Sequence, residues 1–320
     1  MKICLISFDY WNYDHHIVTA LEKKGIEAHS IDISKYAYKY KNIFQKIENF
    51  FNKLFFKKNI KKIKRQQFII EELSKLGQQD SILVIRPDLI DLDTHNVIKE
   101  NTKSYIAYIY DSCKRFPVDH LLDGVFDRIF SFDLEDVKLF GFEHITNFIY
   151  LDKQAITSNF KYDVFIVLSP DQRITQLNAI AAQLENLQIN YKFILVSKGK
   201  PSELHPGIEH RSNEVKAEEL KTYIDNSKVI LDLVRKNHNG ISFRIFEALA
   251  FQKKIITNNT SVKNYSFYNP NNVLVLDPLN IKIDRAFFET DYQPLAQNIY
   301  NQFTIDRFTD VVFNLDKQIT

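Results

Sequence analysis

The sequence is poor in glycine and cysteine and has no long apolar run. Its 320 residues include seven glycines and two cysteines, Cys4 and Cys113. Two thiols in a chain of this length provide no disulfide framework, which fits a reducing compartment. No apolar run approaches the ~20 residues of a membrane-spanning helix. The N-terminal apolar stretch meets Asp9 too soon for a signal peptide, so we expect a cytoplasmic protein, either free or peripheral on the inner face of a membrane.

Common catalytic patterns are also missing. The chain has no G-x-G-x-x-G turn, which argues against a bound dinucleotide, and no P-loop or G-x-S-x-G elbow. Its nine histidines show no convincing ligand spacing and there is no C-x-x-C pair. We therefore expect neither a metal site nor a bound cofactor.

What the chain does contain is an alternation of apolar, strand-like runs with helix-like stretches, which is typical of a parallel sheet covered on both faces. The first series has predicted strands at 2–8, 27–33, 81–86, 104–110, 128–132 and 144–150. The second has predicted strands at 163–168, 191–196, 228–234, 254–257 and 273–276, with helices at 174–187, 216–226 and 243–251. Two such series predict an α/β protein of two Rossmann-like domains, 1–155 and 156–320, facing across a cleft.

Residues 35–65 form a basic, aromatic insertion in the first predicted domain. They contain eleven Lys or Arg and one acid, a local charge of +10 against +2 for the whole chain. Apolar residues recur there at helical spacing, at Ile43, Ile47, Phe50, Phe51, Leu54 and Phe55. Such a helix can lie in an anionic membrane surface, each cation contributing ~1 kcal/mol. Alternatively, the apolar stripe packs on the domain and the lysines face solvent.

Basic and aromatic residues together also occur in single-strand nucleic-acid sites. The α/β pattern around the insertion has no nucleic-acid-binding signature, so we expect no nucleic-acid partner.

The most informative segment is 240–250, which indicates a short loop and then a helix from about Ser242. Gly240 allows a tight turn, Ser242 is a good N-cap, and the first N–H groups of the helix attract anions. Arg244 in the first turn opposes the helix dipole unless an anion binds nearby. Phosphate at this helix start, with a hydroxylated ring beside Glu247, would suit a nucleotide diphosphate. The alternative is a core stripe with an Arg244–Glu247 surface ion pair.

This segment, with 232–235 (DLVR) before it and 257–259 (TNN) and 265–270 (YSFYNP) after it, resembles the donor-binding loop and helix of GT-B glycosyltransferases. It is especially similar to bacterial lipopolysaccharide- and capsule-biosynthesis glycosyltransferases of the CgeB-like group. The resemblance implies metal-independent transfer from a nucleotide-sugar donor, bound by the second domain, to a glycan or lipid-linked glycan acceptor, bound mainly by the first.

By this resemblance Glu247 takes the ribose hydroxyls, as the second glutamate of an E-x7-E motif does. Asn239 stands where the first glutamate would be, which tilts the expectation towards inversion. Basic residues in the strand-end loops of related transferases favour Arg173 and Lys198 as cations that neutralise the diphosphate leaving group. Each could equally be an ordinary surface cation. Asn258 is either a ligand for donor hydroxyls or a turn former.

We expect the residues that activate the acceptor to lie in the first predicted domain. Asp14 and His15 follow its first strand, and a carboxylate beside an imidazole can take a proton from a hydroxyl. Asp111, after another strand, is the competing base. Either aspartate could instead be a cap of the following turn. Two other functions fit the sequence: a sugar-nucleotide epimerase on the same scaffold, or a non-catalytic protein that binds an anionic surface or glycan through 35–65.

Overall fold

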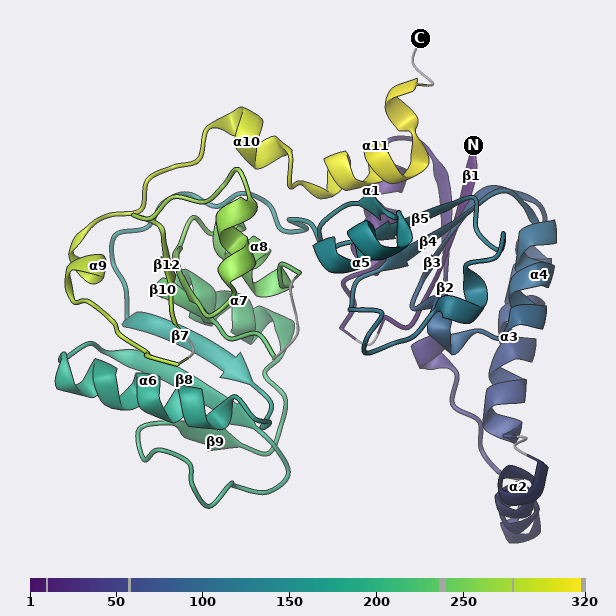
Figure 1. The fold of residues 1–320 in the computed structure, drawn as a ribbon, viewed down its shortest axis with the longest axis horizontal. Helices are drawn as coiled ribbons and strands as arrows, with labels where there is room; N and C mark the ends of the chain where they lie inside the picture. Colours follow the sequence, from purple (N-terminus) through teal and green to yellow (C-terminus); the bar gives the residue numbers. More distant parts are fainter. Residues whose placement is uncertain (10, 57–58, 236–239, 278, 318–320) are drawn as a thin grey trace. The chain divides into compact units, whose positions relative to one another are not determined.

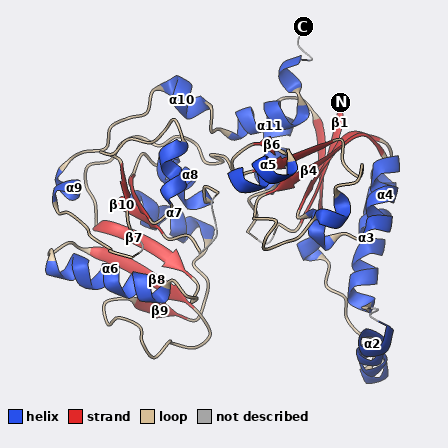
Figure 2. Ribbon diagram, viewed as in Figure 1, coloured by secondary structure: helices blue, strands red, loops and turns tan. Residues whose placement is uncertain are grey.

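The computed structural model describes residues 1–9, 11–56, 59–235, 240–277 and 279–317. The chain folds into two compact units, each built on its own sheet (Figures 1 and 2). The first unit comprises Met1–Ile145 and Ile305–Thr320, and the second comprises Thr146–Thr304. The sequence placed the division at 155/156. The structure places it at 145/146 and returns the C-terminal segment to the first unit.

The first unit contains a six-stranded sheet of order β2-β1-β3-β4-β5-β6, in which every described strand pair is parallel. Its strands are β1 (Lys2–Ser7), β2 (Glu27–Asp32), β3 (Gln79–Ile85), β4 (Thr102–Ile109), β5 (Arg128–Ser131) and β6 (Glu143–His144). Its helices are α1 (His15–Lys23), α2 (Ile43–Phe56), α3 (Ile60–Leu76), α4 (Leu92–Glu100), α5 (Leu134–Phe140) and α11 (Ile305–Phe313).

Helices cover both faces of this sheet. Ile69 of α3 and Ile98 of α4 pack in one core with alternate residues of the central strands, such as Cys4 and Val84. α11 packs on the opposite face, where Phe308 meets the ring of Tyr108 at 5.4 Å. The C-terminal helix is also tied to the end of α1, because Lys24 Nζ donates to Asp306 O at 2.9 Å and to Thr309 Oγ1 at 3.0 Å.

The second unit repeats this plan with a parallel sheet of order β12-β11-β10-β7-β8-β9. Its strands are β7 (Tyr162–Leu168), β8 (Tyr191–Val196), β9 (Glu209–Arg211), β10 (Ser227–Asp232), β11 (Lys254–Thr257) and β12 (Val273–Val275). Its helices are α6 (Ile174–Asn186), α7 (Ala217–Asp225), α8 (Phe243–Ala250), α9 (Ala286–Glu289) and α10 (Gln297–Asn301).

The side-chain alternation of β7 assigns the helices of this unit to two faces. Val164 and Ile166 pack with Leu177 of α6. Phe165, which points the other way, packs with Ile224 of α7 and Phe246 of α8. Continuous apolar strands are needed because both faces are buried. The apolar runs stop at the ends of the strands. These ends, rather than the two faces of the sheet, are therefore exposed.

The strand orders define one switch point in each unit. In the first sheet the chain leaves β1 towards β2 on one side and places β3 on the other. In the second sheet it leaves β7 towards β8 on one side and places β10 on the other. Ligands of open parallel sheets bind outside the carboxyl ends of the strands at such points. Candidate sites are therefore expected after β1 and β3, and after β7 and β10.

The basic insertion forms α2 and the start of α3, and one alternative for it is wrong. The apolar stripe of α2 does not pack on the first unit, because its members, from Ile43 to Phe55, are each at least 47% exposed. In the part of the chain that the structure describes, none of the helices combines the length and the apolar composition of a membrane-spanning segment.

Candidate functional site

The switch point of the second unit carries two arginines that share one carboxylate. Arg173 donates to both oxygens of Asp171, at 2.8 and 2.7 Å, and to the carbonyl of Leu233 at 2.7 Å. Arg235, just beyond β10, donates to Asp171 Oδ2 at 2.9 Å and is 47% exposed. Burial alone would raise the pKa of Asp171, but the hydrogen bonds from the two arginines hold it well below its usual range. The group therefore bears a net positive charge at the sheet edge.

The loop before α8 is held by three side chains from elsewhere in the unit. Asn259 donates to the carbonyl of Gly240 at 2.9 Å, and Asn147 donates to the carbonyl of Ile241 at 3.0 Å. Ser242 occupies the predicted N-cap position, but its hydroxyl donates to the buried Asp232 at 2.8 Å and makes no capping bond. These contacts hold the start of α8 in place, although the Ser242 side chain does not cap the helix.

Arg244 and Glu247 both lie on α8. The alternative interpretation of this segment expected a surface ion pair between them, and these two described residues do not form one. Arg244 is half-buried, and its Nη1 is buried with no hydrogen-bond partner among the described residues. Glu247 is 2% exposed and accepts a hydrogen bond from the hydroxyl of Tyr150 at 2.7 Å. The core part of that alternative is correct, because Phe246 and Leu249 are buried. A buried guanidinium nitrogen without an acceptor is uncommon, and a bound anion is one arrangement that would satisfy it.

The remaining predicted donor residues fall into different surroundings. Lys198 is exposed in the loop after β8. Asn258 pairs with the backbone of Val234, accepting its N–H at 2.7 Å and donating to its carbonyl at 3.2 Å. Asn258 therefore positions the segment that leads to Arg235. Asn239 lies outside the described residues.

At the switch point of the first unit, Asp14 occupies the N-cap position of α1 but does not cap it. Asp9 does so instead, since its carboxylate accepts the N–H of Asp14 at 3.1 Å and the N–H of His15 at 2.8 Å. The Asp14 side chain is buried, whereas His15 is exposed. The expected pairing of this carboxylate with the His15 imidazole is not among the contacts of the described residues.

The surroundings of Asp14 favour its protonated form. Burial raises its pKa to about 8, helped by the negative charges of Asp9 and Asp32 and opposed by a hydrogen bond with the Ser7 side chain. Burial also raises the pKa of Tyr110, and the charge of Asp14 adds to this effect. A carboxyl group whose pKa is near neutrality can exchange protons with a substrate.

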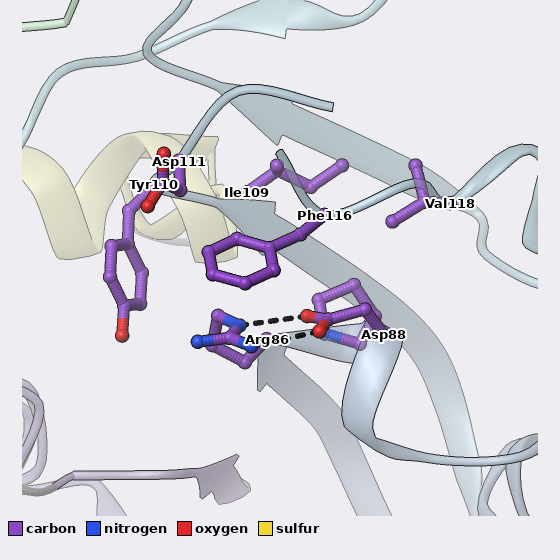
Figure 3. Close-up of a pocket in the computed structure, with 8 residues that line it drawn as sticks. Arg86, Asp88, Ile109, Tyr110, Asp111, Phe116 and Val118 are labelled. Atoms are coloured by element: carbon purple, nitrogen blue, oxygen red, sulfur yellow. Dashed lines mark hydrogen bonds and ion pairs between the residues drawn. The ribbon is translucent and has the colours of Figure 1, made fainter. Parts of the chain in front are cut away.

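Asp111, the competing base, lines a small pocket formed by the ends of β3 and β4 (Figure 3). Its oxygens are engaged: one accepts the Ser112 N–H at 3.0 Å and the other pairs with Arg115 at 2.6 Å. In the same pocket Arg86 donates to both oxygens of Asp88 at 2.8 Å, with the ring of Phe116 over its guanidinium. Of the two aspartates, Asp111 is paired with a cation, and the pKa of Asp14 is raised towards neutrality.

Sequence reasoning missed several residues of these sites. Arg86 has a left-handed backbone, with φ 66° and ψ 56°, at the end of β3. Such strain in a non-glycine residue occurs most at functional positions. Three more residues were missed. Tyr110 and Arg235 come after β4 and β10, and the hydroxyl of Tyr150 contacts Glu247 of α8. The one available signal was the position of Arg86, Tyr110 and Arg235 at the carboxyl ends of predicted strands. Among the described residues, no cluster of His, Cys, Asp or Glu could hold a metal ion.

No family model matches the sequence, and no curated protein matches it. Solved structures do match its fold. A trehalose-6-phosphate synthase is 10% identical, with 100% of each chain covered and a TM-score of 0.60. An alpha-glucosyltransferase in complex with UDP-glucose and DNA containing an abasic site is 11% identical, covering 98% of this chain and 94% of that one, with a TM-score of 0.55.

The UDP-GlcNAc 2-epimerase of Methanocaldococcus jannaschii is 13% identical, covering 98% of this chain and 100% of that one, with a TM-score of 0.50. Identities this low define the fold alone. The predicted fold class is confirmed: the chain is an α/β protein of two Rossmann-like domains, the GT-B architecture.

Proposed function

We propose that this protein is a glycosyltransferase that uses a nucleotide-sugar donor. The observation that carries the proposal is Arg244: a cation in the first turn of α8 with its Nη1 buried and without an acceptor among the described residues. In isolation this arrangement is unfavourable, because the guanidinium opposes the helix dipole and its buried Nη1 lacks an acceptor among the described residues. A diphosphate bound at the start of α8 would supply the missing charge and acceptor.

Other features of the second unit fit the same ligand. Arg173 and Arg235 surround Asp171 with excess positive charge at the switch point, and Lys198 adds an exposed cation after β8. These cations would stabilise the diphosphate as it leaves, which is the charge that develops in glycosyl transfer from a nucleotide sugar. The resemblance assigns Glu247 to the ribose hydroxyls. The neighbours described with UDP-glucose and UDP-GlcNAc share the fold and support a nucleotide-sugar ligand.

In the first unit we assign the role of base to Asp14, with Asp111 and His15 as the lesser candidates. Asp14 would take the proton of an acceptor hydroxyl when it is ionised. The resemblance to the lipopolysaccharide and capsule group makes a surface glycan, free or lipid-linked, the acceptor we propose. The chemistry needs no cofactor besides the donor and, in this proposal, no metal ion.

The test begins with thermal-shift and calorimetric titration of the full chain against UDP, GDP, CMP and dTDP sugars. A donor-binding enzyme should be stabilised by one base and far less by the others. Stabilisation by none would overturn the proposal and favour a non-catalytic binding protein.

The epimerase neighbour makes isomerisation the second candidate. Incubating the best-binding nucleotide sugar with the protein, without acceptor, and analysing the sugar by NMR separates the two. An isomerised sugar indicates an epimerase. A transferase would leave the nucleotide sugar unchanged without acceptor and would consume it only when a glycan acceptor is added.

A further inference from the structure

Helix α2 is amphipathic in the reverse sense of an ordinary surface helix. Among the side chains of α2 whose burial is described, the buried one is polar: Asn49 is 4% exposed, and its neighbours on that face, Gln45 and Asn52, are partly buried. The opposite face carries large apolar side chains that are at least 47% exposed, namely Ile43, Phe44, Ile47, Phe50, Phe51, Leu54 and Phe55. These seven make up nearly half of the fifteen exposed large apolar side chains among the described residues. They form a patch, which single exposed residues elsewhere do not.

This orientation is fixed by hydrogen bonds on the polar face. Asn49 donates to the hydroxyl of Tyr40 at 2.8 Å and accepts the N–H of Ile60, the first residue of α3, at 2.8 Å. Lys61 lies over the ring of the same tyrosine at 5.2 Å. Rotating the helix to bury its aromatic face would break these contacts. The exposed face is therefore the one that this packing presents outward.

The charge of this segment indicates the kind of partner that the apolar face fits. Lys46 and Lys53 are exposed on α2 itself, Lys61, Lys62 and Lys64 are exposed at the start of α3, and the whole segment 35–65 carries a net charge of +10. A second copy of this chain would bring an equally positive segment against it, which opposes self-association. An anionic bilayer surface offers both partners at once: acyl chains for the aromatic face and headgroups for the lysines.

We infer that α2 is a membrane-docking helix, which lies in the interface of an anionic bilayer with Phe44, Phe51 and Phe55 inserted and the lysines at the headgroups. The docking does not depend on the proposed enzymatic function. It would hold the protein at the surface where lipid-linked molecules occur.

The experiment is flotation of the full chain with vesicles of phosphatidylcholine and phosphatidylglycerol in equal parts, compared with phosphatidylcholine alone, without donor or acceptor. We expect binding to the anionic vesicles, weakened by added salt. Replacing Phe44, Phe51 and Phe55 by serine should weaken it about tenfold or more. A matched control replaces three apolar residues of similar exposure outside α2, Leu139, Ile156 and Leu279, by serine and should bind as the parent does.

The electrostatic part is tested by changing Lys46, Lys53 and Lys62 to glutamine. At roughly fivefold per cation, the affinity for anionic vesicles should fall roughly 100-fold. The same change at three exposed lysines elsewhere, Lys138, Lys263 and Lys282, should have a much smaller effect. A parent protein that binds neither vesicle, or phenylalanine variants that bind as well as the parent, would overturn the inference. A dimer seen by analytical ultracentrifugation that the phenylalanine variants dissolve, without vesicle binding, would identify the face as a self-association surface instead.

Discussion

The carboxylate of Asp9 accepts the backbone N–H of Asp14 at 3.1 Å and thereby takes over the capping of α1. Asp14 is released from that role, and its own carboxyl is buried beside Ser7 with a pKa of about 8. The exchange of roles leaves a titratable acid, rather than a cap, at the carboxyl end of β1.

Activity should depend on the ionisation of Asp14. If this residue is the base, kcat/KM falls about tenfold per pH unit below about 8 and levels off above it, because only the carboxylate accepts a proton. Asp14→Asn should lower kcat/KM by about 10²–10⁴-fold and remove this dependence. Asp111→Asn is the matched control, since its carboxylate is paired with Arg115. An unchanged pH profile in Asp14→Asn would assign the base elsewhere.

The raised pKa of Asp14 also predicts how stability depends on pH. The free energy of unfolding should fall as the pH rises, whereas kcat/KM should rise. The folded state holds a proton on Asp14 up to about pH 8, whereas the unfolded chain releases it near the ordinary aspartate pKa of 3.8. The stabilising effect of the raised pKa is therefore complete at low pH and lost as the pH rises towards 8. The asparagine of Asp14→Asn cannot ionise. The difference in unfolding free energy between this variant and the parent should therefore grow, in favour of the variant, by about 1 kcal/mol per pH unit between pH 5 and 8. Urea unfolding at several pH values measures this, and equal pH slopes would contradict it.

The secondary structure was largely predictable where apolar runs are continuous. The predicted strands 191–196 and 254–257 coincide with β8 and β11. Two failures have long-range causes. β6 ends at His144, six residues before the predicted strand end, because Asn147 and Ile149 bond to residues about a hundred or more positions away, Ile241 and Phe303. β9, Glu209–Arg211, was missed because an edge strand of polar residues has no apolar run.

The N-cap positions were predictable, but the partners of the side chains at those positions were not. Ser242 and Asp14 both occupy the N-cap positions that the sequence indicates, yet Ser242 bonds to Asp232 and Asp14 is buried near Ser7. Local patterns identify a cap position and contain no information on a partner from another strand. For α2, the helical period was visible, but the direction of its apolar face depends on the contacts of Asn49.

Removing the guanidinium of Arg244 should weaken donor binding. Arg244→Gln shortens the side chain, keeps a polar end and deletes the charge, so we expect the affinity for the nucleotide found in the screen to fall about 10–100-fold, from the loss of one charge-assisted hydrogen bond. Because Nη1 has no partner among the described residues of the free protein, thermal stability without ligand should not fall. Arg285→Gln, at a 54% exposed arginine of the same unit, is the control. Equal nucleotide affinity in both variants would exclude the α8 site.

Glu247 and Tyr150 separate ligand binding from folding. Tyr150→Phe removes the 2.7 Å hydrogen bond to the buried Glu247 and should lower the free energy of unfolding by about 1–3 kcal/mol. Glu247→Gln keeps a hydrogen-bond acceptor but loses the negative charge, and should weaken nucleotide binding more than it weakens the fold. Urea unfolding and calorimetry measure the two effects. If Glu247→Gln binds the nucleotide as the parent does, the carboxylate has no role at the ribose.

Lys254 predicts a stability change at alkaline pH. Its fully buried amine donates to Phe287 O and Thr290 Oγ1, both at 2.6 Å, and burial, with the charge of Lys228, lowers its pKa to about 8. Between pH 8 and its ordinary value of 10.5 the unfolded chain binds a proton that the folded state has released, so stability should rise with pH there.

Lys254→Met removes this proton uptake and should reduce the slope of unfolding free energy against pH, between 8 and 10, by up to about 1.4 kcal/mol per pH unit. The neighbouring Lys253, whose pKa is also lowered by burial to about 8, maintains a residual slope. Lys263→Met, at an exposed lysine, should leave the slope of the parent unchanged. Guanidinium unfolding at half-unit pH steps distinguishes the variants. Identical slopes for Lys254→Met and Lys263→Met would mean that the buried amine stays charged, held by its carbonyl and hydroxyl acceptors.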